Sequence, residues 1–129
     1  MSQQLRQSYR LTTLNLHNFA APPLACYEWD NIYSQTQWQQ KTQWLLATWQ
    51  QLKPDLLALQ EVFSVDALVE LISAAGFAHW AVSAHPVLVD DHVFQKPVQL
   101  LASRYPLQVQ AWPKLDTSDW PSAMQHCQF

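Results

Sequence analysis

The chain has 129 residues, a length that suits one domain with one hydrophobic core. Hydrophobic residues make up 49% and charged residues 13%, and no apolar run approaches the roughly 18–20 residues needed to cross a bilayer. The net charge of −3, without a block of Lys or Arg, disfavours the broad electrostatic footprint that nucleic-acid binding needs. We therefore expect a soluble globular domain.

The N-terminal sequence lacks the marks of a secretory signal peptide. Residues 1–6 carry one positive charge, and no apolar stretch follows them. Cys26 and Cys127 lie far apart and form no Cys-x-x-Cys or Cys/His cluster of the kind that zinc sites use. We expect both thiols to be reduced and structural, and the protein to be cytoplasmic.

Glycine is almost absent from this sequence. Gly76 stands alone where an average chain of this length would carry about nine glycines. A glycine-rich phosphate-binding loop is therefore excluded. The seven tryptophans indicate aromatic anchoring in a core or an interface.

The first third of the chain predicts a strand, a loop and a helix. Residues 9–16 are aliphatic and β-branched without a breaker, which predicts a buried strand. Residues 20–33 form a long loop, and structureless loops of more than about 12 residues are often functional. Residues 34–52 contain no Gly or Pro and predict an amphipathic helix. Its apolar positions at helical spacing are Trp38, Leu45, Trp49 and Leu52, and we expect Trp38, Trp44 and Trp49 to pack against the sheet.

A second strand and a second helix follow. Pro54 ends the first helix, and residues 55–61 predict a short buried strand with the Glu61 carboxylate at its C-terminal tip. Ser64 is suited to cap a helix whose apolar face runs from Val65 to Ala75. The glycine that follows this helix stands where a C-terminal cap belongs.

The rest of the chain predicts strands. Residues 77–84 and 98–103 read as two strands separated by a loop over 85–96. Residues 107–111 alternate apolar and polar side chains, which predicts one more half-exposed strand. From residue 113 onward the pattern becomes irregular. The alternation of strands and helices predicts an α/β architecture, and by itself favours a doubly wound parallel sheet.

Two polar residues at strand ends are candidates for chemistry. Asn15 lies near the end of the first strand and Glu61 at the end of the second. Side chains at the carboxyl ends of neighbouring strands converge, and an oxygen-rich pair there suits a hard cation such as Mg²⁺. Such a cation polarises a phosphoryl oxygen and helps to generate hydroxide. The alternative is that Asn15 caps a turn and Glu61 is a solvated charge.

Three segments resemble motifs of the endonuclease/exonuclease/phosphatase superfamily of metal-dependent phosphoesterases. Residues 11–16, Leu-Thr-Thr-Leu-Asn-Leu, resemble its opening strand, which ends in an asparagine at the metal and phosphate site. Residues 54–63, Pro-Asp-Leu-Leu-Ala-Leu-Gln-Glu-Val-Phe, resemble the motif whose glutamate is the principal metal ligand. Residues 102–107, Ala-Ser-Arg-Tyr-Pro-Leu, resemble a later Ser-Arg-Tyr-Pro motif near the rim of the site.

The resemblance implies both a fold and a site. The fold is an α/β (α+β) four-layer β-sandwich with flanking helices, of which this chain supplies roughly the first sheet and its helices. The resemblance makes Glu61 and Asn15 the catalytic pair and the ligands of Mg²⁺ (or Mn²⁺). Gln60 then supports the strand end or the groups around the metal, or is a packed structural amide. The resemblance makes Asn15, Arg104 and His17 the contacts to a phosphate-ester substrate, which is a nucleic acid, a phospholipid or a small phosphate. The alternatives are that Arg104 positions its loop and that His17 is a surface or hydrogen-bonded loop histidine.

The resemblance stops short of the family's later motifs. Residues 1–129 contain no Gly-Asp-x-Asn segment, and Ser118-Asp119 is followed by tryptophan instead of the histidine of a Ser-Asp-His motif. We therefore expect one truncated domain, with a core at about 9–112 and an irregular tail at 113–129, and little or no hydrolysis. A sheet with one uncovered face predicts self-association. The alternatives are a non-catalytic half-domain or binding module, and an unrelated flavodoxin-like ligand module.

Overall fold

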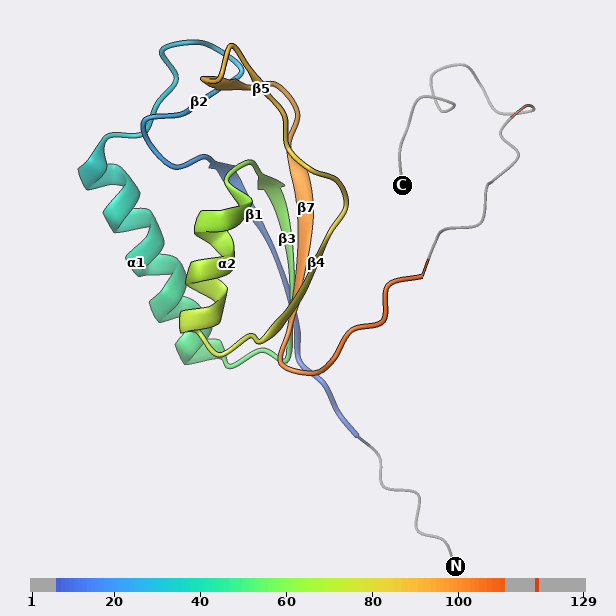
Figure 1. Cartoon of the computed structure of the whole chain (residues 1–129). Coiled ribbons are helices and arrows are strands. Elements are labelled where there is room, and N and C mark those ends of the chain that lie inside the picture. Colours follow the sequence, from blue (N-terminus) through green and yellow to red (C-terminus); the bar gives the residue numbers. More distant parts are fainter. Residues whose placement is uncertain (1–6, 111–117, 119–129) are drawn as a thin grey trace, which may run out of the picture.

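The computed structural model describes residues 7–110 and residue 118, which form two helices and two small sheets (Figure 1). The elements in chain order are β1 (Leu11–Phe19), β2 (Ala25–Cys26), α1 (Gln35–Leu52), β3 (Leu56–Val62), α2 (Val65–Ala74), β4 (His79–Val82), β5 (Leu88–Val89), β6 (Val93–Phe94) and β7 (Val98–Ser103). No helix in the described part of the chain has the length and apolarity needed to cross a membrane.

The larger sheet has four strands in the order β1-β3-β7-β4. β1 and β3 are parallel and are joined through α1, whereas β7 is antiparallel to both of its neighbours, β3 and β4. This mixed sheet confirms the α/β class. The doubly wound parallel arrangement is wrong, because β7 is reached from β4 through a return segment without a crossover helix and so runs in the opposite direction.

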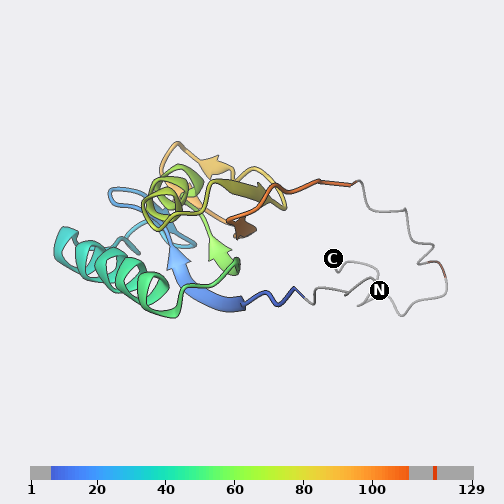
Figure 2. The ribbon, with the colours of Figure 1, turned by 90° about the horizontal axis from the view of Figure 1, so that it is seen from below.

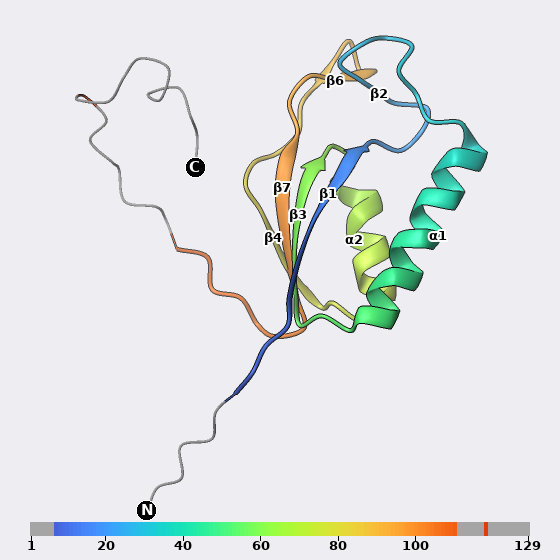
Figure 3. The same ribbon diagram turned by 180° about the vertical axis from the view of Figure 1, so that it is seen from behind.

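Both helices cover the same face of this sheet (Figures 1 and 3). A doubly wound sheet has helices on both faces. Here the described residues form two layers, one of helices and one of strands. Figure 2 shows the helices on one side of the strands in a second view. The second sheet of the four-layer sandwich remains a prediction.

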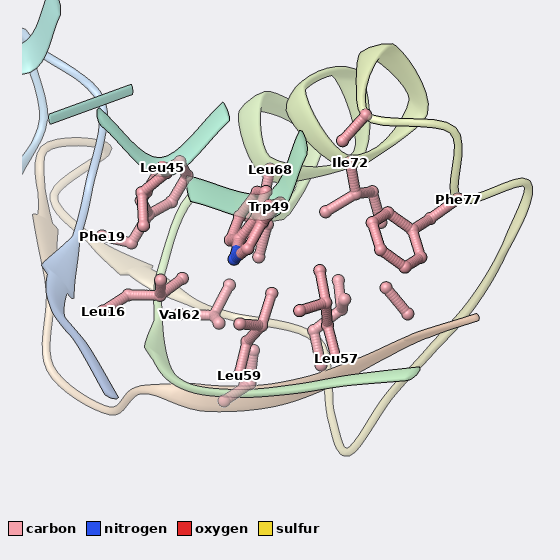
Figure 4. Close-up of a cluster of buried hydrophobic side chains, with 14 residues drawn as sticks. Leu16, Phe19, Leu45, Trp49, Leu57, Leu59, Val62, Leu68, Ile72 and Phe77 are labelled. Atoms are coloured by element: carbon pink, nitrogen blue, oxygen red, sulfur yellow. The ribbon is translucent and has the colours of Figure 1, made fainter. Parts of the chain in front are cut away.

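The core lies between the sheet and the two helices (Figure 4). Alternate side chains of each strand point to the helices, and the helices contribute residues at a spacing of about one turn. Burying one large aliphatic or aromatic side chain contributes about 1.5–3 kcal/mol. The buried side chains of this cluster are Leu16, Phe19, Leu45, Trp49, Leu57, Leu59, Val62, Leu68, Ile72, Ala75, Phe77, Val98, Leu100 and Ala102.

Helix α1 begins with a reciprocal cap. The Ser34 hydroxyl accepts the backbone N–H of Gln37 at 3.1 Å, and the Gln37 side chain accepts the backbone N–H of Ser34 at 3.1 Å. Trp38 and Trp49 pack as predicted, since Trp49 is fully buried and the Trp38 ring lies 4.6 Å from that of Phe19. Trp44 does not pack against the sheet: it is 58% exposed, because its position falls on the solvent side of the helix.

Helix α2 is not capped by Ser64 in the predicted way. The Ser64 hydroxyl makes no cap hydrogen bond and instead accepts the backbone N–H of Ala21 at 2.8 Å. This contact ties the start of α2 to the segment after β1. Gly76 follows the helix with φ +95°, a conformation that explains why the single glycine stands there.

A small second sheet lies within two segments that were predicted to be loops. Its strand order is β2-β6-β5, with β2 from the 20–33 segment and the other two strands from the 85–96 segment. Phe63 and Phe94 pack at its centre with ring centroids 5.5 Å apart. Two-residue strands are too short for an alternating pattern, so the sequence gives no signal for them.

The strand predicted at residues 107–111 is wrong over its described part. Residues 104–110 contain no strand, and Val109 is 77% exposed. Alternation by itself does not make a strand, because the backbone also needs a neighbour with which to pair. Ala111 lies outside the described residues.

Candidate functional site

The parallel pairing of β1 and β3 places their carboxyl ends at one edge of the sheet. Asn15 is paired with Gln60, and Glu61 is the next residue along β3. The register is interrupted after Asn15 in β1, and it is interrupted between Leu59 and Val62 in the pairing of β3 with β7. The structure therefore brings Asn15 and Glu61 together, at the place where both strands leave regular geometry.

The backbone at this edge is strained. His17, Asn18 and Glu61 have φ values of 52°, 60° and 58°. Asparagine tolerates such angles, but for His and Glu each costs on the order of 1–3 kcal/mol. Such strain persists only where the surrounding contacts enforce it, and it concentrates at functional sites.

Two hydrogen bonds hold this geometry. The backbone N–H of Asn18 donates to Glu61 Oε2 at 3.0 Å and fixes the carboxylate against the end of β1. The backbone N–H of His17 donates to Asn15 Oδ1 at 2.8 Å, which closes a short side-chain turn. Asn15 thus does cap a turn, and Glu61 is half-buried and oriented instead of being freely solvated.

The His17 carbonyl anchors this turn to the start of α1. It accepts the Tyr33 hydroxyl at 2.6 Å and the Lys41 ammonium at 3.3 Å. The ammonium also lies 5.3 Å from the centroid of the Tyr33 ring, where a cation is attracted to the aromatic face. The turn after Asn15 is therefore held from two sides.

Electrostatic interactions link Glu61 to its neighbours. Burial raises the pKa of the Cys26 thiol, and the Glu61 charge raises it further while Lys41 lowers it. Burial also raises the pKa of the Tyr33 phenol, with additional contributions from Cys26 and Glu61. Burial lowers the pKa of the Lys41 ammonium, and its electrostatic interactions with Glu61 and then with Cys26 oppose this. The Glu61 carboxylate thus acts on a small group of titratable side chains.

A pocket of about 240 Å³ opens beside the strained turn. Asn18, whose N–H binds Glu61, lies in its wall, so the pocket and the carboxylate share one backbone segment. The remaining wall residues come from β1, β2, the segment between β2 and α1, and the first turn of α1. They are His17, Cys26, Asn31, Ile32, Tyr33 and Gln37.

Gln60 lies on the sheet next to this site. Its amide Nε2 donates to Thr13 Oγ1 at 3.0 Å and to the Ala58 carbonyl at 3.0 Å. Both partners lie further back along their strands, toward the middle of the sheet. Gln60 thus binds the two parallel strands together just before their register is interrupted.

The structure places Arg104 at the opposite end of the sheet. Ser103 is paired with Leu56, the first residue of β3, whereas Glu61 lies near its last residue. The Arg104 side chain donates to the carbonyls of Pro54 at 2.9 Å and Gly76 at 3.3 Å. These contacts join two loops, so the structure does not bring Arg104 to Asn15 and His17.

The site offers oxygen donors for a hard cation. Among the described residues no group of three or more His, Cys, Asp or Glu side chains is placed to hold a metal ion. Glu61 and Asn15 contribute one carboxylate and one amide oxygen. Mg²⁺ commonly uses one or two carboxylates and completes its six positions with water and substrate oxygens, so this donor set is compatible with Mg²⁺.

Three residues around Glu61 were not predicted from the sequence to belong to the site. Cys26, Tyr33 and Lys41 come from the loop and from the helix between β1 and β3. The only sequence signal was the length of the 20–33 loop, since neither a lysine in a polar helix nor a lone tyrosine indicates a site.

Comparison with protein-family models, with curated proteins and with solved structures finds no match for this chain.

Proposed function

We propose that Asn15 and Glu61 hold Mg²⁺ (or Mn²⁺), and that the chain takes part in the metal-dependent hydrolysis of phosphodiester or phosphomonoester bonds, as its motifs suggest. The observation that carries this proposal is the strained edge of the sheet. Asn15 and Glu61 lie on neighbouring strands where the regular pairing is interrupted, and Glu61 itself, His17 and Asn18 have positive φ.

Each residue has a defined task in this proposal. The Glu61 carboxylate, fixed by the N–H of Asn18, binds the cation with its second oxygen. Asn15 Oδ1 accepts the N–H of His17 with one lone pair and offers the other to the cation, while Asn15 Nδ2 can donate to a phosphate oxygen. When bound, the cation supplies charge stabilisation at the phosphoryl group and lowers the pKa of its water.

His17 is the nearest candidate for a substrate contact. It follows Asn15 on the same strained turn, its side chain is exposed, and it lies in the wall of the pocket. Arg104 has no part in the proposal, because its guanidinium is engaged by loop carbonyls at the far end of the sheet.

The alternative function is non-catalytic binding through the same cation. One observation favours it: the amide and the carboxylate are not suited to act as a general base once bound to a cation, and among the described residues no carboxylate hydrogen-bonds the His17 imidazole to orient it as one. In that case the chain binds phosphate esters but does not cleave them.

A Glu61→Gln variant tests the proposal. We expect the chain to bind Mn²⁺, as followed by electron paramagnetic resonance, and expect the variant to weaken binding by at least tenfold because the anionic ligand is lost. Glu70→Gln, which removes the same charge from an exposed position on α2, is the matched control. Equal Mn²⁺ affinity in the two variants would disprove a metal site at Glu61.

Hydrolysis of bis(p-nitrophenyl) phosphate and p-nitrophenyl phosphate separates the two functions. Slow Mg²⁺-dependent release of nitrophenol that disappears in Glu61→Gln supports the hydrolase. Metal binding without turnover supports the binding module.

We also propose that the chain associates with a second copy through the sheet face that the helices leave open. Leu11 and Leu101 are 63% and 37% exposed on this face, and Leu56 is half-buried beside them. Among the described residues, no helix or strand covers it (Figures 1 and 3). An apolar sheet face is normally buried, which favours association.

A further inference from the structure

The pocket beside Glu61 has a composition that selects for one kind of group. At about 240 Å³ it is smaller than the roughly 300 Å³ at which pockets begin to hold drug-sized molecules, so it has room for a single ring. Its wall contains three carboxamides, from Asn18, Asn31 and Gln37. Carboxamides both donate and accept hydrogen bonds, and they pair well with hydroxyl groups.

The wall excludes other substrate classes. Among the described residues the wall contains no Asp, Glu, Lys or Arg, and the nearest charges, Glu61 and Lys41, are already bound to the backbone of the strained turn, so the wall itself supplies no counter-charge for a second phosphate or an ammonium group. Ile32 is its one aliphatic side chain, which is too little for an acyl chain. Tyr33 is its one aromatic ring other than the His17 imidazole, whereas quaternary ammonium groups are held by cages of several rings.

The carboxamides are in part already oriented. Asn31 Nδ2 donates to the Cys26 carbonyl at 3.0 Å, and Gln37 Oε1 accepts the N–H of Ser34 at 3.1 Å. This leaves Asn31 Oδ1 and Gln37 Nε2 for a ligand, an acceptor and a donor respectively. The Tyr33 hydroxyl donates to the His17 carbonyl and keeps its lone pairs as acceptors.

We propose that this pocket binds a neutral polyhydroxylated ring, so that the substrate is a sugar or polyol phosphate ester whose phosphate lies at Glu61. The proposal rests on the proposed function for the position of the phosphate, but binding of the ring itself requires no metal. Asn18 connects the two parts, since its N–H holds Glu61 and it lies in the pocket wall.

Metal-free protein provides the direct test. The full chain in EDTA is titrated with methyl β-D-ribofuranoside and with myo-inositol, and the side-chain amide signals in nitrogen-15 spectra are followed. We expect saturable shifts for the carboxamides of the pocket. Cytosine, phosphocholine and a short-chain fatty acid are the comparison probes, and stronger binding of any of these would overturn the sugar assignment.

Two variants locate the binding. Ile32→Trp fills the pocket and is expected to weaken ring binding at least tenfold, whereas Val87→Trp, at a position that is 73% exposed in the separate groove between β4 and α2, leaves it unchanged. Asn18→Gly suits the positive φ and removes only the carboxamide, with an expected loss of about three- to tenfold. Unchanged affinity in both pocket variants would overturn the proposal.

The metal and pocket assignments fail separately. Mn²⁺ binding that Glu61→Gln removes, together with no ring binding, disproves the pocket assignment and leaves the metal site intact. Ring binding that Ile32→Trp removes, without Mn²⁺ binding, confirms the pocket and disproves the metal-dependent function.

Discussion

At the scale of single residues, the site is a short piece of irregular backbone held from several directions. His17, Asn18 and Glu61 adopt φ values that non-glycine residues avoid. The N–H of Asn18 on Glu61, and the Tyr33 hydroxyl on the carbonyl of His17, hold these angles in place. Such angles persist only where surrounding contacts of this kind enforce them.

Arg104 illustrates how a residue in a recognisable motif can have a structural task. Its guanidinium donates to the carbonyls of Pro54 and Gly76, and it stacks 4.5 Å from the centroid of the Phe77 ring. These contacts join the loop before β3 to the loop after α2. The absence of Cβ at Gly76 makes room for the guanidinium, since an added Cβ would lie 2.6 Å from Arg104 Nη1.

We expect Arg104→Ala to lower the free energy of unfolding by about 1–3 kcal/mol, since two carbonyls lose a charged donor and an aromatic ring loses its cation. Urea denaturation measures this loss, with the exposed Lys96→Ala as the control for removing one positive charge. Mn²⁺ affinity should stay at the wild-type value. A loss of Mn²⁺ or phosphate binding without a loss of stability would instead place Arg104 at the site.

At the scale of elements, α1 organises both the core and the site. Its apolar side places Trp49 against the sheet, its first turn supplies Gln37 to the pocket, and Lys41 reaches the carbonyl of His17. The reciprocal cap at Ser34 fixes where the helix begins. Displacement of α1 would therefore disturb the packing and the strained turn together.

Substitutions of Trp49 and Trp44 compare the buried side of α1 with its exposed side. Trp49→Ala is expected to cost about 3–5 kcal/mol, because it empties a large fully buried site, whereas Trp44→Ala should change stability by less than about 0.5 kcal/mol. Trp49→Phe should be milder than Trp49→Ala. It keeps most of the packing and removes a buried indole N–H that has no hydrogen-bond partner among the described residues.

Thermal and urea denaturation of the three variants measure these differences. Equal stability of Trp44→Ala and Trp49→Ala would contradict the observed packing of α1.

At the scale of the whole molecule, the two layers formed by the described residues leave one face of the sheet uncovered by any other of these residues. Both helices cover the opposite face, so alternate side chains of the strands point away from the core. Leu101 lies on β7, an inner strand, and is 37% exposed on this open face. An apolar sheet face of this kind is normally buried against another layer.

Leu101→Lys is expected to weaken self-association, because it places a charge in the middle of the open face. Sedimentation velocity over a range of concentrations measures the shift toward monomer. Val87→Lys, at an exposed position in the groove beside α2, is the matched control and should leave the association unchanged. A monomeric wild-type chain at all concentrations would contradict the proposed association.

The sequence determined the main elements of the fold, because each has a local signal. Both long helices and the strands β1, β3, β4 and β7 were predicted with boundaries within a few residues of those observed. The position of Glu61 near the end of its strand follows from the same periodicity, whereas β1 continues past Asn15 to Phe19. The position of Gly76 just after the second helix was likewise a local property, whereas the predicted cap at Ser64 is not formed.

Only the tertiary structure decided which strands pair and which residues surround Glu61. Strand direction depends on the path of the connection, so the antiparallel position of β7 could not be read from alternation. Residues 107–110 alternate without forming a strand, because a strand also needs a neighbour with which its backbone can pair. Tyr33, just before α1, and Lys41, in its first half, lie beside the strained turn because the connection from β1 to β3 packs against it. A long-range contact of this kind leaves no periodic trace in the sequence.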